Sequence, residues 1–417
     1  MTKDISVTTL GCGIKFALKP SNSQVAYCAL SIKSGTRNEP DQFSGIAHMT
    51  EHMLFKGTAR RTSTQINNRL ERLGGELNAY TTKEETVIYS TVLQEDLSKA
   101  IDLLFEIAFT STYPEKELEK ERQVVIDEIN MYKDTPSDSI FDDFEELIFE
   151  NHPLSKSILG SAKSLKKINS EALKQYAGNG FKAENMAVSV VCSLPVSKVE
   201  KIVSDAAVKY VGSVETASNL ARKEPQDAVS LSVGKKFDKT INKKNHQVNC
   251  IVGATAYSLY DKSRMPLILL SNILGGPASN SRLNQSLRER SALVYTIESS
   301  YIQYADTGVM MVYFGCEKPN LERCISLVRT EIAKLRDNPL SDSALASAKK
   351  QLLGQLAVAS DNGEAKVLSM GKSLLSYGDI LSNSEIRRQI DEIDAITLQR
   401  VAAEVLAEER LSTLIYL

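Results

Sequence analysis

Tryptophan is absent from this chain, histidine and cysteine are scarce, and the charges almost cancel. Among 417 residues there are four histidines and six cysteines, and the net charge is −2. A near-neutral chain has no bulk electrostatic affinity for nucleic acid. No apolar run approaches the length needed to span a bilayer. We therefore expect neither nucleic acid nor a membrane among the partners.

The cysteines also indicate where the protein works. They stand at positions 12, 28, 192, 250, 316 and 324 without a Cys-x-x-Cys spacing, which is typical of free thiols in a reducing compartment. The first ten residues lack the apolar core of a signal peptide and are not rich in arginine. These features predict a bacterial cytoplasmic protein. With 42% hydrophobic and 24% charged residues, a chain of this length should form two or more globular domains.

The chemistry is concentrated in one short segment, His-Met-Thr-Glu-His, at residues 48–52. On a helix the spacing of four places His48 and His52 on one face, and Glu51 projects to the same side. Two imidazoles and a carboxylate are the ligand and base set of a catalytic zinc, and His-x-x-Glu-His is the inverzincin signature. The alternative is a histidine pair without metal. An apolar stripe predicts that this helix packs into a core and ends at Gly57; it consists of Ile46, Met49, Met53 and Leu54.

A third ligand is needed, because catalytic zinc sites keep three protein ligands and one open position. Residues 114–131 have a strongly helical composition, with a proline suited to the first turn. Glu121 and Glu128 lie seven residues apart, two turns along one face. Val124, Val125 and Ile129 place this helix against the core. Glu128 is therefore a carboxylate on a partly buried helix, suited to a cation.

The combined motifs resemble those of a known family. His48-x-x-Glu51-His52, followed by 75 residues and then Glu128, is similar to the pitrilysin (insulinase) family of metallopeptidases. The most similar subgroup is the β subunit of mitochondrial processing peptidase with its bacterial relatives. Ala292 departs from the glycine that relatives usually carry, and we expect this to be harmless for packing. Matching segments extend over essentially the whole chain: Gly74–Thr81, His152-Pro153 with Gly160, and Arg288 and Tyr295 within Leu287–Tyr295.

The resemblance implies a role for each residue of the metal motif. His48, His52 and Glu128 would bind one Zn²⁺ per chain. Glu51 would take a proton from the zinc-bound water and pass it to the leaving amine. Glu121 would support the ligands from behind. The alternatives are a helix-surface carboxylate for Glu51 and, for Glu121, a solvated charge paired with a nearby lysine.

Further residues are implied to hold the substrate. Arg288 and Tyr295 match a pair that contacts the substrate backbone and the oxygen that gains charge in the transition state; otherwise they are a surface arginine and a packed tyrosine. A segment after a Gly-Gly turn matches an edge strand that binds an extended peptide by strand addition; otherwise it is an internal strand. That segment is Asn78, Ala79, Tyr80 and Thr81.

Asp138 and Asp142 lie four apart and should share a helix face. They match positions where the processing peptidase carries acidic groups that receive an arginine upstream of the cleaved bond. The alternative is a pair of carboxylates favoured by a helix N-terminus. We assign no metal role to His152 or His246. Gly275-Gly276-Pro277 is not a phosphate-binding loop, because no Lys-Ser/Thr follows in register.

The chain reads as a diverged repeat of about 220 residues, since each half closes with a helix and a terminal strand. We predict an α+β fold of two homologous α/β sandwich domains, each an antiparallel-rich sheet with helices packed on one side. The family resemblance implies the same metallohydrolase layout. The predicted bounds are 1–211 for the catalytic domain, 212–227 for a linker, and 228–417 for a second domain. Its counterpart of the metal helix, Met265–Gly276, contains no histidine.

The resemblance implies a zinc endopeptidase that hydrolyses unfolded peptides or presequence-like polypeptides in a closed dimeric chamber. A homodimer would be self-sufficient, with Arg288 and Tyr295 of one subunit completing the zinc site of the other. A hetero-partner without the zinc motif stays open. One competing hypothesis is a non-catalytic partner subunit, although such relatives have usually lost a ligand. A structural metal protein would need a fourth ligand, and no cysteine lies near the motif.

Overall fold

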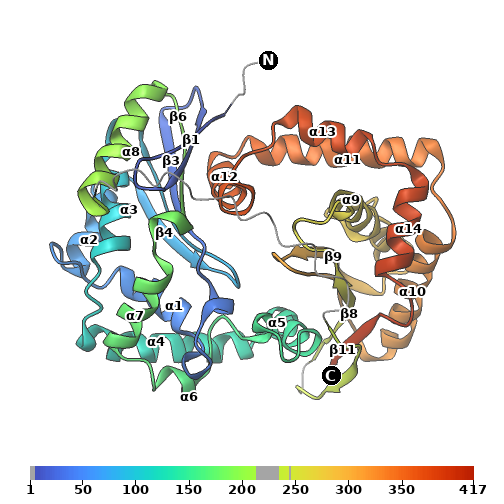
Figure 1. The fold of residues 1–417 in the computed structure, drawn as a ribbon. Helices are drawn as coiled ribbons and strands as arrows, with labels where there is room; N and C mark the ends of the chain where they lie inside the picture. The colour runs from blue at the N-terminus through green and yellow to red at the C-terminus, as the bar shows by residue number, and fades with distance from the viewer. Residues whose placement is uncertain (1–4, 213–233, 244–245) are drawn as a thin grey trace. The chain divides into compact units, whose positions relative to one another are not determined.

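The computed structural model describes residues 5–212, 234–243 and 246–417 (Figure 1). The chain divides into two compact units, which are not continuous in sequence. Within the described ranges, no helix combines the length and apolar character that crossing a membrane requires. Unit 1 comprises Met1–Asn130, Lys156–Ala221 and Ala357–Ser382, and unit 2 comprises Met131–Ser155, Arg222–Leu356 and Asn383–Leu417.

The sheet of unit 1 has the strand order β1-β2-β6-β3-β5-β4. Strands β2 and β6 are parallel, and all other neighbours are antiparallel. β4 is therefore at an edge, hydrogen-bonded to β5 on one side. The strands are β1 (Ser6–Thr9), β2 (Lys15–Pro20), β3 (Val25–Ile32), β4 (Glu76–Thr81), β5 (Thr86–Leu93) and β6 (Met186–Cys192).

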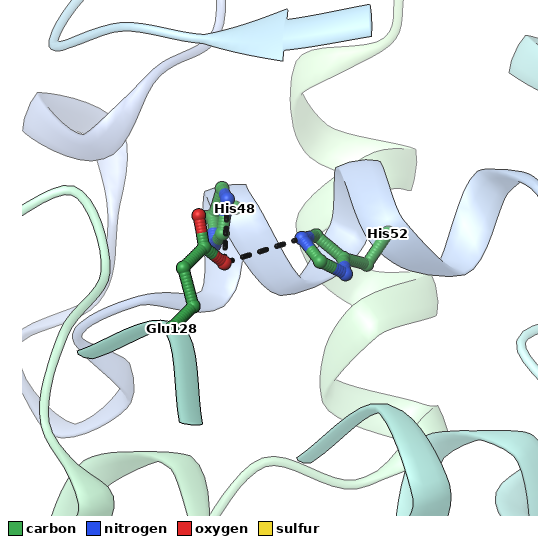
Figure 2. Close-up of side chains that lie close together, drawn as sticks. All are labelled: His48, His52 and Glu128. Atoms are coloured by element: carbon green, nitrogen blue, oxygen red, sulfur yellow. Dashed lines mark ion pairs between the residues drawn. The ribbon is translucent and has the colours of Figure 1, made fainter. Parts of the chain in front are cut away.

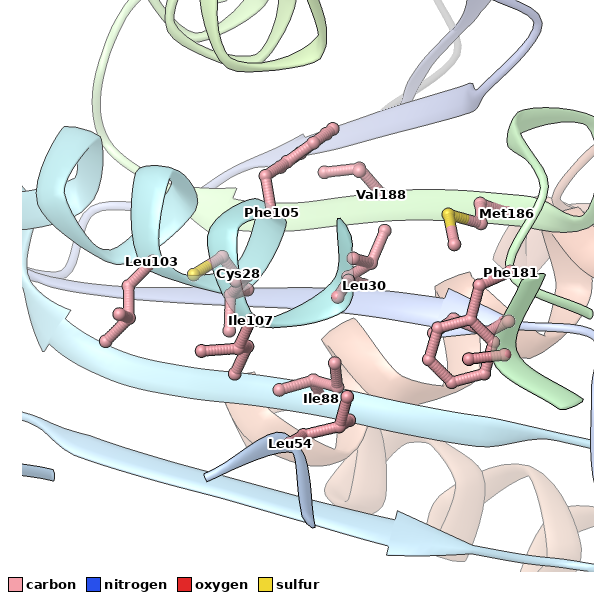
Figure 3. Close-up of a cluster of buried hydrophobic side chains, with 14 of the residues drawn as sticks. Cys28, Leu30, Leu54, Ile88, Leu103, Phe105, Ile107, Phe181, Met186 and Val188 are labelled. Atoms are coloured by element: carbon pink, nitrogen blue, oxygen red, sulfur yellow. The ribbon is translucent and has the colours of Figure 1, made fainter. Parts of the chain in front are cut away.

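Helices cover both faces of this sheet. On one face the apolar side of α3 packs against the central strands, and Figure 3 shows Phe105 and Ile107 of α3 in one cluster with Cys28 and Leu30 of β3. These side chains are fully buried, so they form the main core of the unit. The helices of unit 1 are α1 (Ile46–Leu54), α2 (Ser63–Glu71), α3 (Leu97–Thr110), α4 (Glu115–Lys133), α6 (Ala162–Leu165), α7 (Ser170–Gly180), α8 (Val196–Tyr210) and α12 (Gly363–Tyr377).

The opposite face of the same sheet is covered by α12, which comes from the C-terminal half of the sequence. The strands present small residues there, Ala17, Ala29 and Ala187, which lets the helix approach closely. A Cβ added to Gly371 of α12 would lie 2.2 Å from the Ser31 hydroxyl oxygen. Burial of Val367, Met370 and Leu374 against this face ties the helix to the sheet.

Unit 2 repeats this arrangement, with the strand order β7-β11-β8-β10-β9. β7 and β11 are parallel and the other neighbours antiparallel, as in β2-β6-β3-β5-β4 of unit 1. The strands are β7 (Asp238–Ile241), β8 (Val248–Ala256), β9 (Val294–Gln303), β10 (Gly308–Cys316) and β11 (Ser412–Tyr416). The helices are α5 (Pro136–Ile148), α9 (Arg264–Gly275), α10 (Leu321–Asp337), α11 (Asp342–Ser360), α13 (Asn383–Asp391) and α14 (Ala395–Val405).

α5, from the N-terminal half, occupies in unit 2 the place that α12 occupies in unit 1. Its Phe144 and Ile148 are buried with Ile251 of β8 and Tyr416 of β11. Gly253 of β8 makes room, since a Cβ there would lie 3.0 Å from the Phe144 ring. Each half of the sequence thus contributes one helix to the sheet of the other half.

The predicted α+β class with two homologous sandwich domains is confirmed, and α7 before β6 matches α14 before β11 at the two ends of the repeat. The structure adds one helix on the second face of each sheet, which the sequence did not indicate. Of the predicted linker, residues 212–227, all but residue 212 lie outside the described residues. The division into 1–211 and 228–417 therefore stays a prediction, while the compact units exchange the segments 131–155 and 357–382.

Candidate metal centre

The metal motif lies on α1, whose first turn is fixed by a buried carboxylate. The helix begins after Gly45, which has φ +90° and offers no side chain as a cap. Glu39 replaces that cap, since its two carboxylate oxygens accept the backbone N–H groups of Gly45 at 3.0 Å and Ala47 at 2.9 Å. Burial raises the pKa of Glu39 to about 7. The helix ends at Leu54, three residues before the predicted stop at Gly57.

Gly160 explains a second part of the sequence resemblance. It has φ +68°, and a Cβ at this position would lie 2.4 Å from the backbone oxygen of Ser44 and 2.8 Å from Cα of Gly45. Two glycines therefore pack backbone to backbone where α1 begins. This contact helps set the direction in which the metal helix enters the core.

Three side chains converge at the centre: His48 and His52 of α1 and Glu128 of α4 (Figure 2). Oε2 of Glu128 lies 3.8 Å from Nε2 of His48 and 3.7 Å from Nε2 of His52. One ligand atom from each residue lies within 4.8 Å of the others, and this is the one group of its kind in the part of the chain that the structure describes. α4 therefore brings Glu128, which follows Glu121 by two helix turns, to the histidine pair of α1.

The donor set fits a zinc ion. Two imidazoles and a carboxylate are the ligands of many catalytic zinc sites, in which the ligand atoms stand roughly 3.4 Å apart. Burial, with a smaller effect of His52, lowers the pKa of His48 to about 3. The ring is therefore neutral at pH 7, the state that binds a metal. Figure 2 shows all three side chains turned toward one point.

Glu121 lies behind the ligands. Its Oε2 is 3.0 Å from Nδ1 of His52, and its Oε1 is 2.6 Å from Nζ of Lys56. A proton on Nδ1, donated to Glu121, leaves Nε2 of His52 unprotonated and directed at Glu128. Since Glu121 is buried, this contact fixes the ring more firmly than a solvated pair would. The supporting role that the resemblance implies for Glu121 stays a prediction, and the pair with Lys56 is the contact that the alternative foresaw.

Glu51 is held by a contact that the sequence did not predict. The hydroxyl of Thr81 donates a hydrogen bond of 2.6 Å to Oε2 of Glu51. Burial raises the pKa of Glu51, and the bond from Thr81 opposes that rise. Thr81 was expected only as part of a substrate-binding strand. No local pattern links residues thirty apart, so only the sheet could bring this hydroxyl to α1.

Thr81 is the last residue of β4, the edge strand that starts at Glu76. Among the described residues, no other strand pairs with its outer side. An edge strand offers free N–H and C=O groups to an extended chain. This strand ends beside the metal ligands, because Thr81 contacts Glu51. The segment predicted to bind substrate is Asn78, Ala79, Tyr80 and Thr81, and all four residues belong to β4.

The other predicted site residues belong to unit 2. Arg288 is exposed in a short π-helix, Asn284–Glu289, and Tyr295 at the start of β9 is 73% exposed. Asp138 and Asp142 lie one turn apart on α5, as expected. Since the metal ligands belong to unit 1, the roles of these four residues stay predictions.

Ala292 is not the harmless packing change that the sequence suggested. Its φ is +49°, a left-handed conformation that glycine adopts freely and alanine does not. The residue lies in the turn between Arg288 and Tyr295, and its N–H donates to the Arg288 carbonyl oxygen at 3.0 Å. Alanine is therefore strained here by about 1 kcal/mol.

The two remaining histidines, His152 and His246, belong to unit 2. Nε2 of His152 is 3.4 Å from Oδ2 of Asp306 in unit 2, and His246 is exposed. Neither belongs to the group of three ligands found among the described residues.

Comparison with known proteins gives two family matches and many relatives. The model for insulinase (peptidase family M16) matches residues 15–162, and that for the peptidase M16 inactive domain matches 167–352. The chain is 31% identical over 391 residues to the uncharacterized zinc protease YmxG of Bacillus subtilis, covering 93% of this chain and 92% of that one. It is 29% identical over 404 residues to the probable mitochondrial-processing peptidase subunit beta of Arabidopsis thaliana, covering 95% and 75%.

Solved structures share the fold. A protease from Helicobacter pylori superposes with a TM-score of 0.85 at 22% identity, covering 99% of both chains. A peptidase M16 inactive domain from Pseudomonas fluorescens gives a TM-score of 0.85 at 19% identity, covering 99% of this chain and 97% of that one. The match over nearly full length supports the two-unit architecture.

Proposed function

The chain belongs to the insulinase family, peptidase family M16, and is a zinc-dependent peptidase; from this premise we propose that it is an endopeptidase acting on unfolded or presequence-like polypeptides. The observation that carries the proposal is the convergence of His48, His52 and Glu128 with a buried, hydrogen-bonded Glu51 beside them. Relatives without activity would be expected to lack part of this set, whereas this chain retains all four residues.

The residues divide the work of peptide hydrolysis. His48, His52 and Glu128 would hold the zinc ion, which when bound would supply a Lewis acid for the scissile carbonyl and for water. Glu51 takes the proton from the attacking water and delivers it to the leaving nitrogen. Thr81 holds the carboxylate of Glu51 in place, and Glu121 holds the ring of His52. Lys56 neutralises Glu121 on the side away from the histidine.

The open edge of β4 supports a preference for extended substrates. A polypeptide that adds to this edge pairs its backbone with β4, whereas in a folded protein most backbone groups are already hydrogen-bonded. Main-chain recognition makes little demand on side-chain sequence. We assign Asn78, Ala79, Tyr80 and Thr81 to this role, with Thr81 at the end that adjoins Glu51.

Charged residues of unit 2 would add specificity. Asp138 and Asp142 on α5 suit a basic side chain of the substrate through opposite charge. Arg288 and Tyr295 are exposed donors suited to the substrate backbone and to the oxygen that gains charge. A substrate in which arginine is replaced by glutamate should therefore be cut more slowly.

We further propose a homodimer with two sites, in which Arg288 and Tyr295 of one copy serve the zinc centre of the other. The chain itself contains both parts of such a site, and the Arabidopsis relative is named as a subunit. A second candidate, a hetero-partner without the zinc motif, would leave the purified chain inactive. Six free cysteines support a reducing cytoplasm as the place of action.

The activity test is cleavage of a quenched, unstructured, arginine-containing peptide by wild type, by Glu51→Gln and by chelator-treated protein. We expect cleavage only by wild type, and an unchanged zinc content in Glu51→Gln. Wild-type protein that holds one zinc per chain yet leaves every peptide intact would reject an endopeptidase that is active by itself and favour a missing hetero-partner or a non-catalytic role.

Mixing two inactive variants tests the shared site. Glu51→Gln and Arg288→Ala are expected to be inactive alone. After exchange of subunits, a mixed dimer contains one site with both intact residues, so activity should return toward a quarter of the wild-type level. If activity does not return in a preparation shown to exchange subunits, Glu51 and Arg288 of one subunit act in the same site, and the shared site is rejected.

A further inference from the structure

A basic pocket lies on unit 1, beside α2 and apart from the metal ligands. It is open, with a volume of about 530 Å³. No carboxylate lines it, although the net charge of the chain is −2, so the positive charge is local to this surface. The cations that line it are Arg60, Arg61, Arg69, Arg72 and Lys99.

Two of these cations are already neutralised. Arg61 forms an ion pair with Glu106, whose side chain is fully buried, and Lys99 pairs with Asp96 at 2.7 Å. These pairs connect the rim of the pocket to α3 and its start, so the rim is rigidly placed. Their charges are therefore not the ones available to a ligand.

The charge of the other three guanidinium groups is not balanced by a carboxylate of the described residues. Within the described ranges, Arg60, Arg69 and Arg72 form no ion pair, and Nε of Arg69 is buried there without a hydrogen-bond partner. Arg60 stands over the ring of Tyr210 at 5.6 Å, which fixes its position. Like charges gathered around one pocket repel one another, and a bound anion would relieve that repulsion. A buried donor without a partner favours an acceptor in the same place.

The helix arranges neutral donors between these charges. Asn68 and Arg72 are four residues apart, as are Gln65 and Arg69, so they occupy consecutive turns on one side of α2. All four side chains line the pocket. Leu73 is the one apolar residue among those that line it, and the methylene stems of the long cationic side chains supply the rest of its apolar surface.

We propose that this pocket binds an anion with several linked phosphate groups, of the size of diphosphate or triphosphate. Guanidinium groups bind phosphate oxygens through two parallel hydrogen bonds, which favours phosphate over a simple halide. Three unpaired arginines match several negative charges rather than one. The volume lies in the range of small-ligand sites and exceeds the needs of a single phosphate.

The test is titration calorimetry of the full-length protein with inorganic triphosphate at physiological salt. Arg69→Ala/Arg72→Ala should weaken binding at least about tenfold, because two charge-assisted contacts are lost. The control is Arg387→Ala/Arg388→Ala on α13, which removes the same charge from two exposed arginines of unit 2 and should leave the affinity unchanged. If the first variant does not fold, Arg60→Ala, at an exposed position, replaces it and should weaken binding at least about threefold.

ATP with an affinity equal to that of triphosphate would support the proposal, since the phosphate chain is then what is recognised. Absence of triphosphate binding to wild type, or equal weakening in both double variants, would overturn it in favour of non-specific charge. If the affinity of Arg69→Ala/Arg72→Ala is unchanged and its melting temperature is lowered, the proposal is wrong. These arginines would then serve only to stabilise the C-terminal end of α2 through its helix dipole. Tighter binding of a single-stranded RNA, lost in that variant, would make the surface a nucleic-acid site.

Discussion

At the scale of single residues, the centre depends on carboxylates that are placed around the metal ligands. Glu39 sets the start of α1, Glu121 orients His52, and Glu51 is held by Thr81. The sequence predicted the histidines and Glu51 because helix periodicity fixes their spacing, and the family resemblance implied Glu128. It did not predict Glu39 or the contact of Thr81, since both depend on loops and strands that meet only in the folded chain. These contacts lead to two predictions.

Glu121→Gln should weaken zinc binding about 10- to 100-fold, because a neutral amide holds the Nδ1 proton of His52 less strongly than a carboxylate does. The measurement is competition with a chelator of known affinity. The control is Glu119→Gln on the same helix, where the side chain is 65% exposed and pairs with Arg122. Equal zinc affinity in the two variants would show that Glu121 has no part in holding the metal.

Glu39→Gln should change how stability depends on pH. The pKa of Glu39 is raised from 4.5 to about 7 by burial, so the folded state holds a proton that the unfolded state releases. Its contribution is fully present below pH 4.5 and is lost as the pH rises to about 7. Over this window the unfolding free energy of wild type should fall relative to the variant, by a difference of the order of 3 kcal/mol.

Urea unfolding of both proteins between pH 4 and pH 8, followed by far-UV circular dichroism, measures that difference; tryptophan fluorescence is no option because the chain has none. A difference that stays constant across the range would mean that Glu39 is not the group that takes up the proton.

At the scale of elements, close helix-to-sheet contacts decide the structure. The repeat and the terminal strands follow from hydrophobic patterning and turn signals, whereas the edge position of β4 was implied only by the family resemblance. The placing of α5 and α12 does not follow from any local pattern, because each packs on a sheet about 100 residues or more away along the chain. The one sign of the α12 contact in the sequence is the small size of Ala17, Ala29 and Gly371. Small residues are common in helices and strands, so they do not by themselves predict the contact.

Gly371→Ala should destabilise the protein by about 1–3 kcal/mol, because the new methyl group would overlap the side chain of Ser31 across the α12 contact. Gly354→Ala on α11, where no atom lies within 4 Å of an added Cβ, should instead stabilise by about 0.5–1 kcal/mol. Both are read from thermal and urea unfolding. Equal effects of the two substitutions would contradict a close approach of α12 to the sheet.

At the scale of the whole molecule, the exchange of segments makes each unit depend on both halves of the chain. Unit 1 contains residues 357–382, and unit 2 contains residues 131–155. The metal ligands lie in unit 1, so the catalytic half of the sequence is incomplete without a helix that follows it by more than 150 residues. The two family matches, at 15–162 and 167–352, both end before α12 and give no indication of this dependence.

A fragment of residues 1–212 should therefore aggregate or melt without cooperativity, since the sheet face that α12 covers would be exposed. Joining residues 357–382 to this fragment through a flexible Gly-Ser linker should restore a cooperative transition and zinc binding. The measurements are solubility, thermal unfolding and zinc content. A fragment 1–212 that unfolds as cooperatively as the joined one would show that α12 is dispensable for unit 1.

Because α12 is translated late, its position in the sequence also affects how the protein folds during synthesis on the ribosome. The sheet of unit 1 is complete once β6 has been made, but its covering helix ends only at Tyr377. At translation rates of roughly 5–20 residues per second, the alanine-rich face of the nascent sheet stays open to solvent for on the order of 10 s. During that interval the growing chain needs a temporary cover, which makes it a substrate for ribosome-associated chaperones before it can act on substrates of its own.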